Sequence, residues 1–377
     1  MDSTQIKTPC YMIDKGLLEK NLEILAMVKE RTGCRILLAL KAFAMFSLFP
    51  VIREYLDGVC ASSADEARLG HEEFKKQVHI YSPAYDKEEF MGQLDFAHTI
   101  NFNSFRQLYS FKNVVMQNRK NIKMGLRINP EFSEVKPEIY NPCSPCSRLG
   151  IKAHEFQGQD RDGISGLLFH THCEQNADAL EKTLKVVEDK FGRIIKSMDW
   201  INFGGGHHIT RQDYDIDKLC SLISAFMERY KVEVFLEPGE AVVLKCGFLI
   251  TSVLDIINNQ KQIAIMDTSA AAHMPDILEM PYRPAIKGAG EPQQYKYDYR
   301  LGGLSCLAGD IIGDYSFQEP LKIGDKLVLM DMAHYTMVKN NTFNGVRLPS
   351  IGIWDPEKGE ANIIRKFDYS DYKNRLS

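Results

Sequence analysis

The sequence predicts an α/β protein that combines a (β/α)8 barrel of the TIM type with a mostly β C-terminal domain. From residue 17 to about 240, short runs rich in β-forming residues alternate with amphipathic helical stretches. Eight such units in about 225 residues fit a closed barrel better than a doubly wound open sheet. After residue 241 the helical pattern fades. We therefore expect a barrel over 16–240 and a β-rich domain formed by 1–15 and 241–377.

Local patterns give the barrel elements in chain order. The first helix ends at Gly33, and the helix after the second strand begins with a capping box at 63–66, Ser-Ala-Asp-Glu. The predicted strands are 35–40, 57–62, 78–82, 97–102, 123–130, 164–172, 199–206 and 232–239, and the longer predicted helices are 18–33, 46–56, 63–76, 104–115, 176–191 and 215–230.

The second domain is predicted from β-like segments separated by Gly and Pro turns. These segments are 241–259, 261–269 and 325–335. The N-terminal stretch 8–14, Thr-Pro-Cys-Tyr-Met-Ile-Asp, is also β-like and precedes the first barrel helix. We expect it to join the second domain.

Composition excludes several classes of function. The 377 residues are 44% hydrophobic and 25% charged, with a net charge of −4, so no basic surface for nucleic acid is indicated. The apolar run 35–50 is interrupted by Lys41 and Pro50, which argues against a membrane span. No export signal is evident, and nine scattered cysteines fit a reducing cytoplasm. For the isolated Cys143-x-x-Cys146 pair we favour a loop over a metal or redox site.

Chemistry in such barrels gathers at the C-terminal ends of the strands. A lysine, two histidines, a glycine triplet and a glutamate fall on that rim. Taken in strand order, the candidates are Lys41, then Ser62, Ser63 and Glu66, then Arg127 and Asn129, then His170 and His172, then Gly204, Gly205 and Gly206, and finally Glu237.

Two of these groups invite specific chemistry. Three glycines let the backbone approach a ligand closely, and barrels often hold phosphate after their seventh and eighth strands, so Gly204–Gly206 predicts a phosphate site. The His170-x-His172 pair leaves three interpretations open: zinc ligands, a ring packed on a planar ligand, or satisfied core histidines.

A rim lysine, a phosphate loop and a rim glutamate together suggest pyridoxal 5′-phosphate. Lys41 can form a Schiff base if its pKa is lowered in a dry site, and the apolar run around it is expected to supply that dryness. Glu237 can keep the pyridine nitrogen protonated, so that the ring accepts electrons.

With these residues the chain resembles the pyridoxal-phosphate-dependent decarboxylases of fold type III, which are alanine-racemase-like and include ornithine and diaminopimelate decarboxylases. The matching segments occur in family order across almost the whole chain: LALKA, CASSADEARLG, LLFHTHCEQN, NFGGGHH, EPGEAVV, GGLSCLAGD and MDMAHYT.

The resemblance implies a role for each matching position. Lys41 is similar to the Schiff-base lysine and Cys306 to the cysteine that gives a proton to the product carbon. In the family that cysteine comes from the second subunit, which implies a homodimer with shared active sites. The other implied contacts are to the cofactor: His172 on its ring, Gly204, Gly205, Gly206 and Tyr335 at its phosphate, and Glu237 at its pyridine nitrogen, with Glu66 and Arg127 in supporting positions.

The departures from the family pattern bear on the substrate. HCEQ replaces the family's HxGS after His172, which removes the usual serine contact to phosphate. Leu307 stands where ornithine decarboxylases have an aspartate, and Glu240 where diaminopimelate decarboxylases have an arginine. Glu240 and Asp276 could form an acidic pocket for a long polyamine, since a carboxylate repels a distal carboxylate and attracts an ammonium.

This pattern is similar to that of decarboxylases acting on carboxynorspermidine and carboxyspermidine. We expect such a decarboxylase, acting in polyamine biosynthesis and without a metal. Three alternatives stay open: a decarboxylase of diaminopimelate or of a basic amino acid such as arginine or ornithine, a zinc amidohydrolase using His170 and His172, and a non-catalytic protein that binds polyamine or cofactor.

Overall fold

The computed structural model describes residues 2–118 and 120–377 and divides them into two compact units. The barrel unit is Asn21–Val242, and the sheet unit is Val243–Ser377 with the N-terminal segment that ends at Lys20. The boundaries expected after residues 15 and 240 lie near these. Within the described residues, none of the helices is long and apolar enough to cross a membrane.

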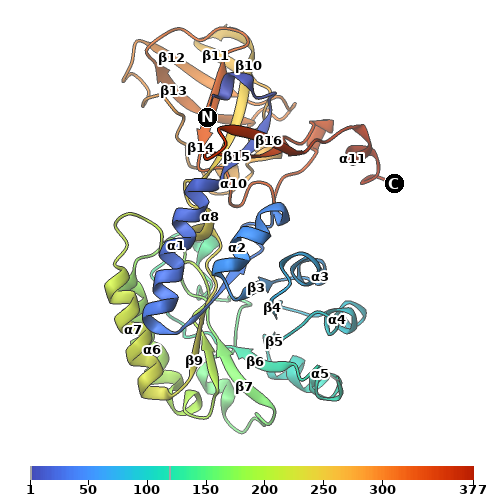
Figure 1. The fold of residues 1–377 in the computed structure, drawn as a ribbon, viewed down its shortest axis with the longest axis vertical. Coiled ribbons are helices and arrows are strands. Elements are labelled where there is room, and N and C mark those ends of the chain that lie inside the picture. Colours follow the sequence, from blue (N-terminus) through green and yellow to red (C-terminus); the bar gives the residue numbers. More distant parts are fainter. Residues whose placement is uncertain (1, 119) are drawn as a thin grey trace. The chain divides into compact units, whose positions relative to one another are not determined.

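The barrel unit contains the predicted closed parallel barrel, whose strands form a ring with helices outside it (Figure 1). Each strand pairs in parallel with the next, and β9 pairs with β2 to close the ring, with Arg35 opposite Phe235. The strands are β2 (Arg35–Ala39), β3 (Gly58–Ala61), β4 (Gln77–Tyr81), β5 (Thr99–Phe102), β6 (Lys123–Arg127), β7 (Ile164–Leu168), β8 (Trp200–Asn202) and β9 (Glu233–Leu236).

The connecting helices begin where the sequence supplies capping side chains. Ser63, Ser104 and Asp215 each accept a hydrogen bond from a backbone N–H in the first turn of the following helix. The helices are α1 (Lys15–Thr32), α2 (Phe49–Tyr55), α3 (Ala64–Leu69), α4 (Lys87–Gln93), α5 (Phe105–Gln117), α6 (Ala177–Ile195) and α7 (Ile216–Tyr230), with short 3-10 turns at Phe46–Leu48, Glu138–Tyr140 and Ala153–Phe156.

The helix predicted over 63–76 is not one continuous α-helix. The α-helix ends at Leu69, a π-helical turn follows over Gly70–Phe74, and Lys75 ends it in the left-handed region at φ 60°. A Cβ on Gly70 would lie 2.5 Å from Val59 Cγ2, so the glycine lets the turn pack tightly on β3.

The barrel interior is filled around Trp200 of β8. A Cβ on Gly125 or Gly166 would come within 2.5 Å of the indole, so these glycines on β6 and β7 leave room for the ring. Leu37 and Phe235 complete this cluster. The interior is therefore a packed core that supports the rim above it.

The sheet unit is built on strands in the order β13-β12-β11-β10-β1-β15-β16, with β14 also paired to β10. As predicted, the N-terminal strand β1 (Cys10–Asp14) belongs here, antiparallel to β10 and parallel to β15. The other strands are β10 (Gly247–Asn259), β11 (Lys261–Met266), β12 (Tyr297–Gly302), β13 (Ile311–Phe317), β14 (Lys326–Met330), β15 (Ser350–Asp355) and β16 (Glu360–Arg365).

Short helices interrupt this unit and correct one expectation. The β-like segment predicted over 241–259 starts in a helical turn, α8 (Glu240–Val243), and the strand begins only at Gly247. A Cβ on Gly247 would lie 2.3 Å from Ala333 Cβ, so the strand starts where its backbone packs closely. The remaining short helices are α9 (Ala270–His273), α10 (Asp276–Glu279) and α11 (Tyr369–Lys373), with 3-10 turns at Ser3–Gln5 and Phe343–Gly345.

Candidate active site

The rim of the barrel gathers the side chains predicted for that unit. Lys41 lies in the turn after β2, Glu237 directly after β9, and the glycine triplet directly after β8. The neighbours of Lys41, Leu40, Ala42 and Phe43, are buried, as the apolar run suggests. Lys41 itself is exposed, so its apolar neighbours do not bury its side chain. The run anchors the turn in the core and leaves the amine at the surface of the rim.

Glu237 is held at the rim by Asn202. The Asn202 side chain donates to Glu237 Oε1 at 2.7 Å and accepts from the Gly204 N–H at 2.8 Å, so one buried amide fixes both the carboxylate and the glycine loop. Burial raises the pKa of Glu237, and the Asn202 hydrogen bond and the charge of Lys41 oppose that rise. A cation placed against Glu237 would therefore be bound strongly.

The glycine triplet is required by close backbone packing. Gly204 and Gly206 have φ of +71° and +82°, and a Cβ on Gly206 would lie 2.0 Å from the carbonyl oxygen of His172. The N–H groups of Gly204 and Gly205 donate to Asn202 and His170. Over the described parts of the chain, the Gly206 N–H has no hydrogen-bond acceptor, so it stays available for an anion.

His172 is oriented by Gln175. Its Nδ1 lies 2.8 Å from Gln175 Oε1, whereas its Nε2 is buried and has no hydrogen-bond partner within the described residues. The ring of His207 lies beside it, with centroids 4.9 Å apart. Burial lowers the pKa of His172, so the ring is neutral. A buried, oriented ring with one unused nitrogen suits contact with a ligand.

His170 is used within the protein and does not support the zinc interpretation. Its Nδ1 accepts from the Gly205 N–H at 2.9 Å, and burial, with Lys41 and Arg127 nearby, lowers its pKa well below the usual range. Neither His170 nor His172 belongs to a group of three metal-ligand side chains in the part of the chain described. The zinc amidohydrolase alternative therefore loses its proposed ligands.

Arg127 and Glu66 are also on the rim side of the barrel unit. Arg127 is 6% exposed, lies over the Tyr81 ring at 4.6 Å, and donates to the carbonyl of His170 at 3.4 Å. Glu66 accepts from the Ser62 N–H at 2.6 Å, and burial raises its pKa against the pull of Lys41. Glu66 interacts electrostatically with Lys41, whereas Arg127 and Lys41 both act on the pKa of His170.

Glu240 faces a histidine that the sequence analysis did not select. Its Oε1 lies 3.2 Å from Nε2 of His208, which is 6% exposed. Glu174 joins them, since one ligand atom from each of the three side chains lies within 4.8 Å of the others. The acidic character expected at Glu240 is thus reinforced by a second carboxylate.

In the sheet unit, Cys306 and Asp276 have defined local partners. Cys306 is exposed, and its N–H donates to Asn344 Oδ1 at 2.7 Å. Asp276 pairs with Lys339, which also pairs with Glu279. Burial raises the pKa of Asp276, and Lys339 opposes that rise. Asp276 therefore already has a cation beside it. Tyr335 is half-buried with a left-handed φ of 50°.

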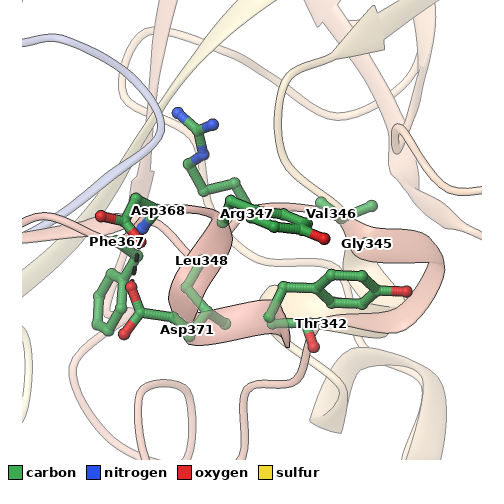
Figure 2. Close-up of a pocket in the computed structure, with 10 residues that line it drawn as sticks. Thr342, Gly345, Val346, Arg347, Leu348, Phe367, Asp368 and Asp371 are labelled. Atoms are coloured by element: carbon green, nitrogen blue, oxygen red, sulfur yellow. Dashed lines mark hydrogen bonds between the residues drawn. The ribbon is translucent and has the colours of Figure 1, made fainter. Parts of the chain in front are cut away.

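A pocket of about 100 Å³ lies elsewhere in the sheet unit (Figure 2). The segment 342–348 and the C-terminal residues 367–372 line it. None of the predicted site residues lines this pocket. Cys143 and Cys146 lie in the loop between β6 and β7, as expected, and all nine cysteines are free.

Four residues of the rim were missed from the sequence: Asn202, Gln175, Glu174 and His208. Asn202 left a usable signal, because an asparagine inside a strand buried on both sides needs partners. Glu174 and Gln175 lie in the HCEQ departure, which the sequence marked as a loss of a serine. Glu174 adds a carboxylate near His208, and Gln175 forms a hydrogen bond with His172. Both contacts depend on loop geometry, which no local sequence pattern encodes.

The chain is similar to known proteins over most of its length. A family model described as pyridoxal-dependent decarboxylase, C-terminal sheet domain, matches residues 10–333. Carboxynorspermidine/carboxyspermidine decarboxylase of Campylobacter jejuni is 46% identical over 98% of this chain and 99% of its own. Carboxyaminopropylagmatine decarboxylase of Synechocystis is 44% identical over 99% and 96% of the two chains.

A solved structure is similar over the same length. The crystal structure of carboxynorspermidine decarboxylase from Campylobacter jejuni complexed with norspermidine has 45% identity and a TM-score of 0.92, covering 98% of this chain and 100% of that one. The match includes the closed parallel barrel and the separate sheet unit. This chain belongs to the pyridoxal-dependent decarboxylase family.

Proposed function

We propose that this decarboxylase removes CO2 from carboxynorspermidine or carboxyspermidine and releases norspermidine or spermidine. The observation that carries the proposal is Glu240, a carboxylate on the same rim as Lys41 and Glu237, placed next to His208 and Glu174. A distal carboxylate, as in diaminopimelate, would be repelled there, whereas an ammonium would be attracted. The relatives that act on carboxylated polyamines support the same substrate class.

The rim residues fit pyridoxal phosphate. His172 has a buried ring nitrogen without a partner, the Gly206 N–H is available for phosphate, and Glu237 is poised to face a cation. Lys41 supplies an exposed primary amine for the aldehyde. The Gly204–Gly206 loop would hold the phosphate together with Tyr335, while His172 would contact the ring and Glu237 the pyridine nitrogen.

When bound, the cofactor takes up the electrons left by the departing carboxylate. Glu237 keeps a positive charge on the pyridine nitrogen, because a buried carboxylate is stabilised by a cation beside it. Cys306 would give a proton to the carbon that has lost CO2, and Lys41 would hold the cofactor through its primary amine. Glu240 and Asp276 would each bind an ammonium group of the polyamine.

The first experiment measures CO2 release by the holoenzyme from carboxynorspermidine, carboxyspermidine, carboxyaminopropylagmatine and diaminopimelate. We expect release from the first two. Release from diaminopimelate alone would overturn the assignment of Glu240. Preference for carboxyaminopropylagmatine would instead move the substrate to that of the Synechocystis relative, to which this chain is almost equally similar. Lys41→Ala is expected to abolish both decarboxylation and the visible absorbance of the lysine-bound cofactor.

We further propose that the enzyme acts as a cytoplasmic homodimer in which Cys306 serves the partner subunit's barrel. The nine free cysteines suit a reducing compartment. Mixing inactive Lys41→Ala and Cys306→Ala proteins tests the shared site. In a random mixture half the dimers are mixed, and each of these has one intact site, so about a quarter of wild-type activity is expected. If each site is made by a single chain, mixing restores none.

A further inference from the structure

Three side chains on the barrel rim form a group that the assigned cofactor contacts do not use. Glu174 follows β7, His208 follows β8, and Glu240 follows β9, so three neighbouring strands each supply one member. We propose that Glu174 and His208 complete, with Glu240, a subsite for one ammonium group of the polyamine. This inference rests on the proposed function and adds two residues that set its specificity.

The loops that carry the group are tied together by their backbones. The His208 N–H donates to the carbonyl of Gln175 at 3.2 Å, and the Gln175 N–H donates to the carbonyl of Gly206 at 3.0 Å. The Thr210 hydroxyl donates to the carbonyl of Ala241 at 2.6 Å. Glu174 adopts a left-handed φ of 53°, which directs the chain from the His172 turn into this bridge. The group is therefore held by the fold and is not a chance meeting of surface charges.

His208 supplies a second observation that points to a ligand at this group. The residue is 6% exposed, and neither ring nitrogen has a hydrogen-bond partner among residues 2–118 and 120–377. Its Nε2 nevertheless lies 3.2 Å from Glu240 Oε1. Leaving a buried imidazole without a hydrogen bond costs about 1–3 kcal/mol. A ligand that donates a hydrogen bond to the ring would recover that cost.

The chemistry of the group favours an ammonium. The two carboxylates offer only acceptors to a bound ligand, and an ammonium offers only donors. Acceptors arranged tetrahedrally at about 2.8 Å from one nitrogen lie about 4.6 Å apart, which is close to the 4.8 Å within which these atoms lie. A zinc ion with tetrahedral ligands at about 2.1 Å requires them about 3.4 Å from one another, which is a stricter condition.

The test compares Glu174→Gln with Glu228→Gln in the holoenzyme. Glu174 and Glu228 are both exposed glutamates of the barrel unit, but Glu228 lies on α7, away from the rim. Norspermidine binding is measured by calorimetry, and KM and kcat are measured with carboxynorspermidine. We expect Glu174→Gln to weaken norspermidine binding and raise KM by about tenfold with little change in kcat, because a charge-assisted hydrogen bond is lost. Glu228→Gln should change neither value.

A second variant and a metal titration separate the possible outcomes. His208→Asn should weaken norspermidine binding as well, and its cofactor absorbance reports whether the rim stays intact. If wild-type enzyme is active and Glu174→Gln matches Glu228→Gln, the subsite is refuted while the proposed function stands. If Zn²⁺ binds stoichiometrically only when Glu174 is present and norspermidine binding is unchanged, the group is a metal site. If wild-type enzyme decarboxylates neither carboxylated polyamine, both proposals fall.

Discussion

His172 and Gln175 are joined by a hydrogen bond of 2.8 Å between Nδ1 and Oε1. Because the amide oxygen can only accept, the ring carries its proton on Nδ1 and leaves Nε2 as a buried acceptor. Gln175 also anchors the loop through its own N–H and carbonyl, which bond to Gly206 and His208. One residue from the HCEQ segment thus sets both the tautomer of His172 and the path of the glycine loop.

Removing the Gln175 side chain should weaken cofactor binding. Gln175→Ala frees the His172 ring to rotate, and the loss of one hydrogen bond, about 1 kcal/mol, corresponds to roughly a fivefold rise in the dissociation constant of pyridoxal phosphate. The measurement is a cofactor titration followed by absorbance. Gln212→Ala changes an exposed glutamine of the same unit and should have no effect. Equal affinities for the two variants would show that His172 is oriented by other contacts.

A side chain at Gly206 should destabilise the barrel unit as well as the cofactor site. In Gly206→Ala the new Cβ would meet the carbonyl of His172 at 2.0 Å, in addition to the strain of φ +82°. We expect a loss of about 3 kcal/mol in unfolding free energy, measured with urea. Gly158→Ala is the matched control, because Gly158 has φ +70° but open space around it, so only about 1–2 kcal/mol of strain applies.

Stability should fall in mild acid because buried histidines resist protonation. Burial lowers the pKa of His79 to about 3, while its ordinary value is 6.5. Below pH 6.5 the unfolded chain binds a proton that the folded chain does not, so stability present above that pH is lost as the pH falls toward 3. His79→Leu should reduce the slope of unfolding free energy between pH 4 and 6 by about 1.4 kcal/mol per pH unit. Replacing the exposed His154 by Gln should leave the slope unchanged.

Asn344 is expected to position Cys306, the proposed proton donor. Its Oδ1 accepts from the Cys306 N–H at 2.7 Å, and its own φ of 56° is in the left-handed region. Asn344→Ala should lower kcat about fivefold with little change in KM or cofactor absorbance, since the thiol is less well placed. Asn362→Ala, at an exposed position on β16, is the control. A change in KM alone would assign Asn344 to substrate binding.

The order of the barrel elements could be read from the sequence because each strand and helix has its own local pattern. Gly33 and the Ser63 cap mark a helix end and a helix start, and Leu37 and Ile36 mark a buried strand. The π-helical turn at Gly70–Phe74 could not be read, since it depends on how closely Gly70 approaches Val59.

The site was predictable where one residue type defines the chemistry and not where contacts between loops define it. Lys41, Glu237 and the glycine triplet follow strands, so their common rim follows from barrel topology. The exposure of Lys41 could not be predicted from its apolar neighbours, because a turn can bury those neighbours and leave one side chain exposed to solvent. Glu174 and His208 lie on loops that follow different strands. Their proximity could not be predicted from their spacing along the chain.

The position of β1 between β10 and β15 has a consequence for biosynthesis. Residues 10–14 leave the ribosome long before their neighbours at 247–259 and 350–355 are made. During that interval the barrel strands can pair. The apolar strand β1 still lacks both of its partner strands, so its unpaired backbone groups can pair with other chains. A nascent chain stalled near residue 242 ought to leave Cys10 open to thiol labelling, and the finished protein ought to protect it. A segment that is synthesised early is thus among the last to pair in the fold.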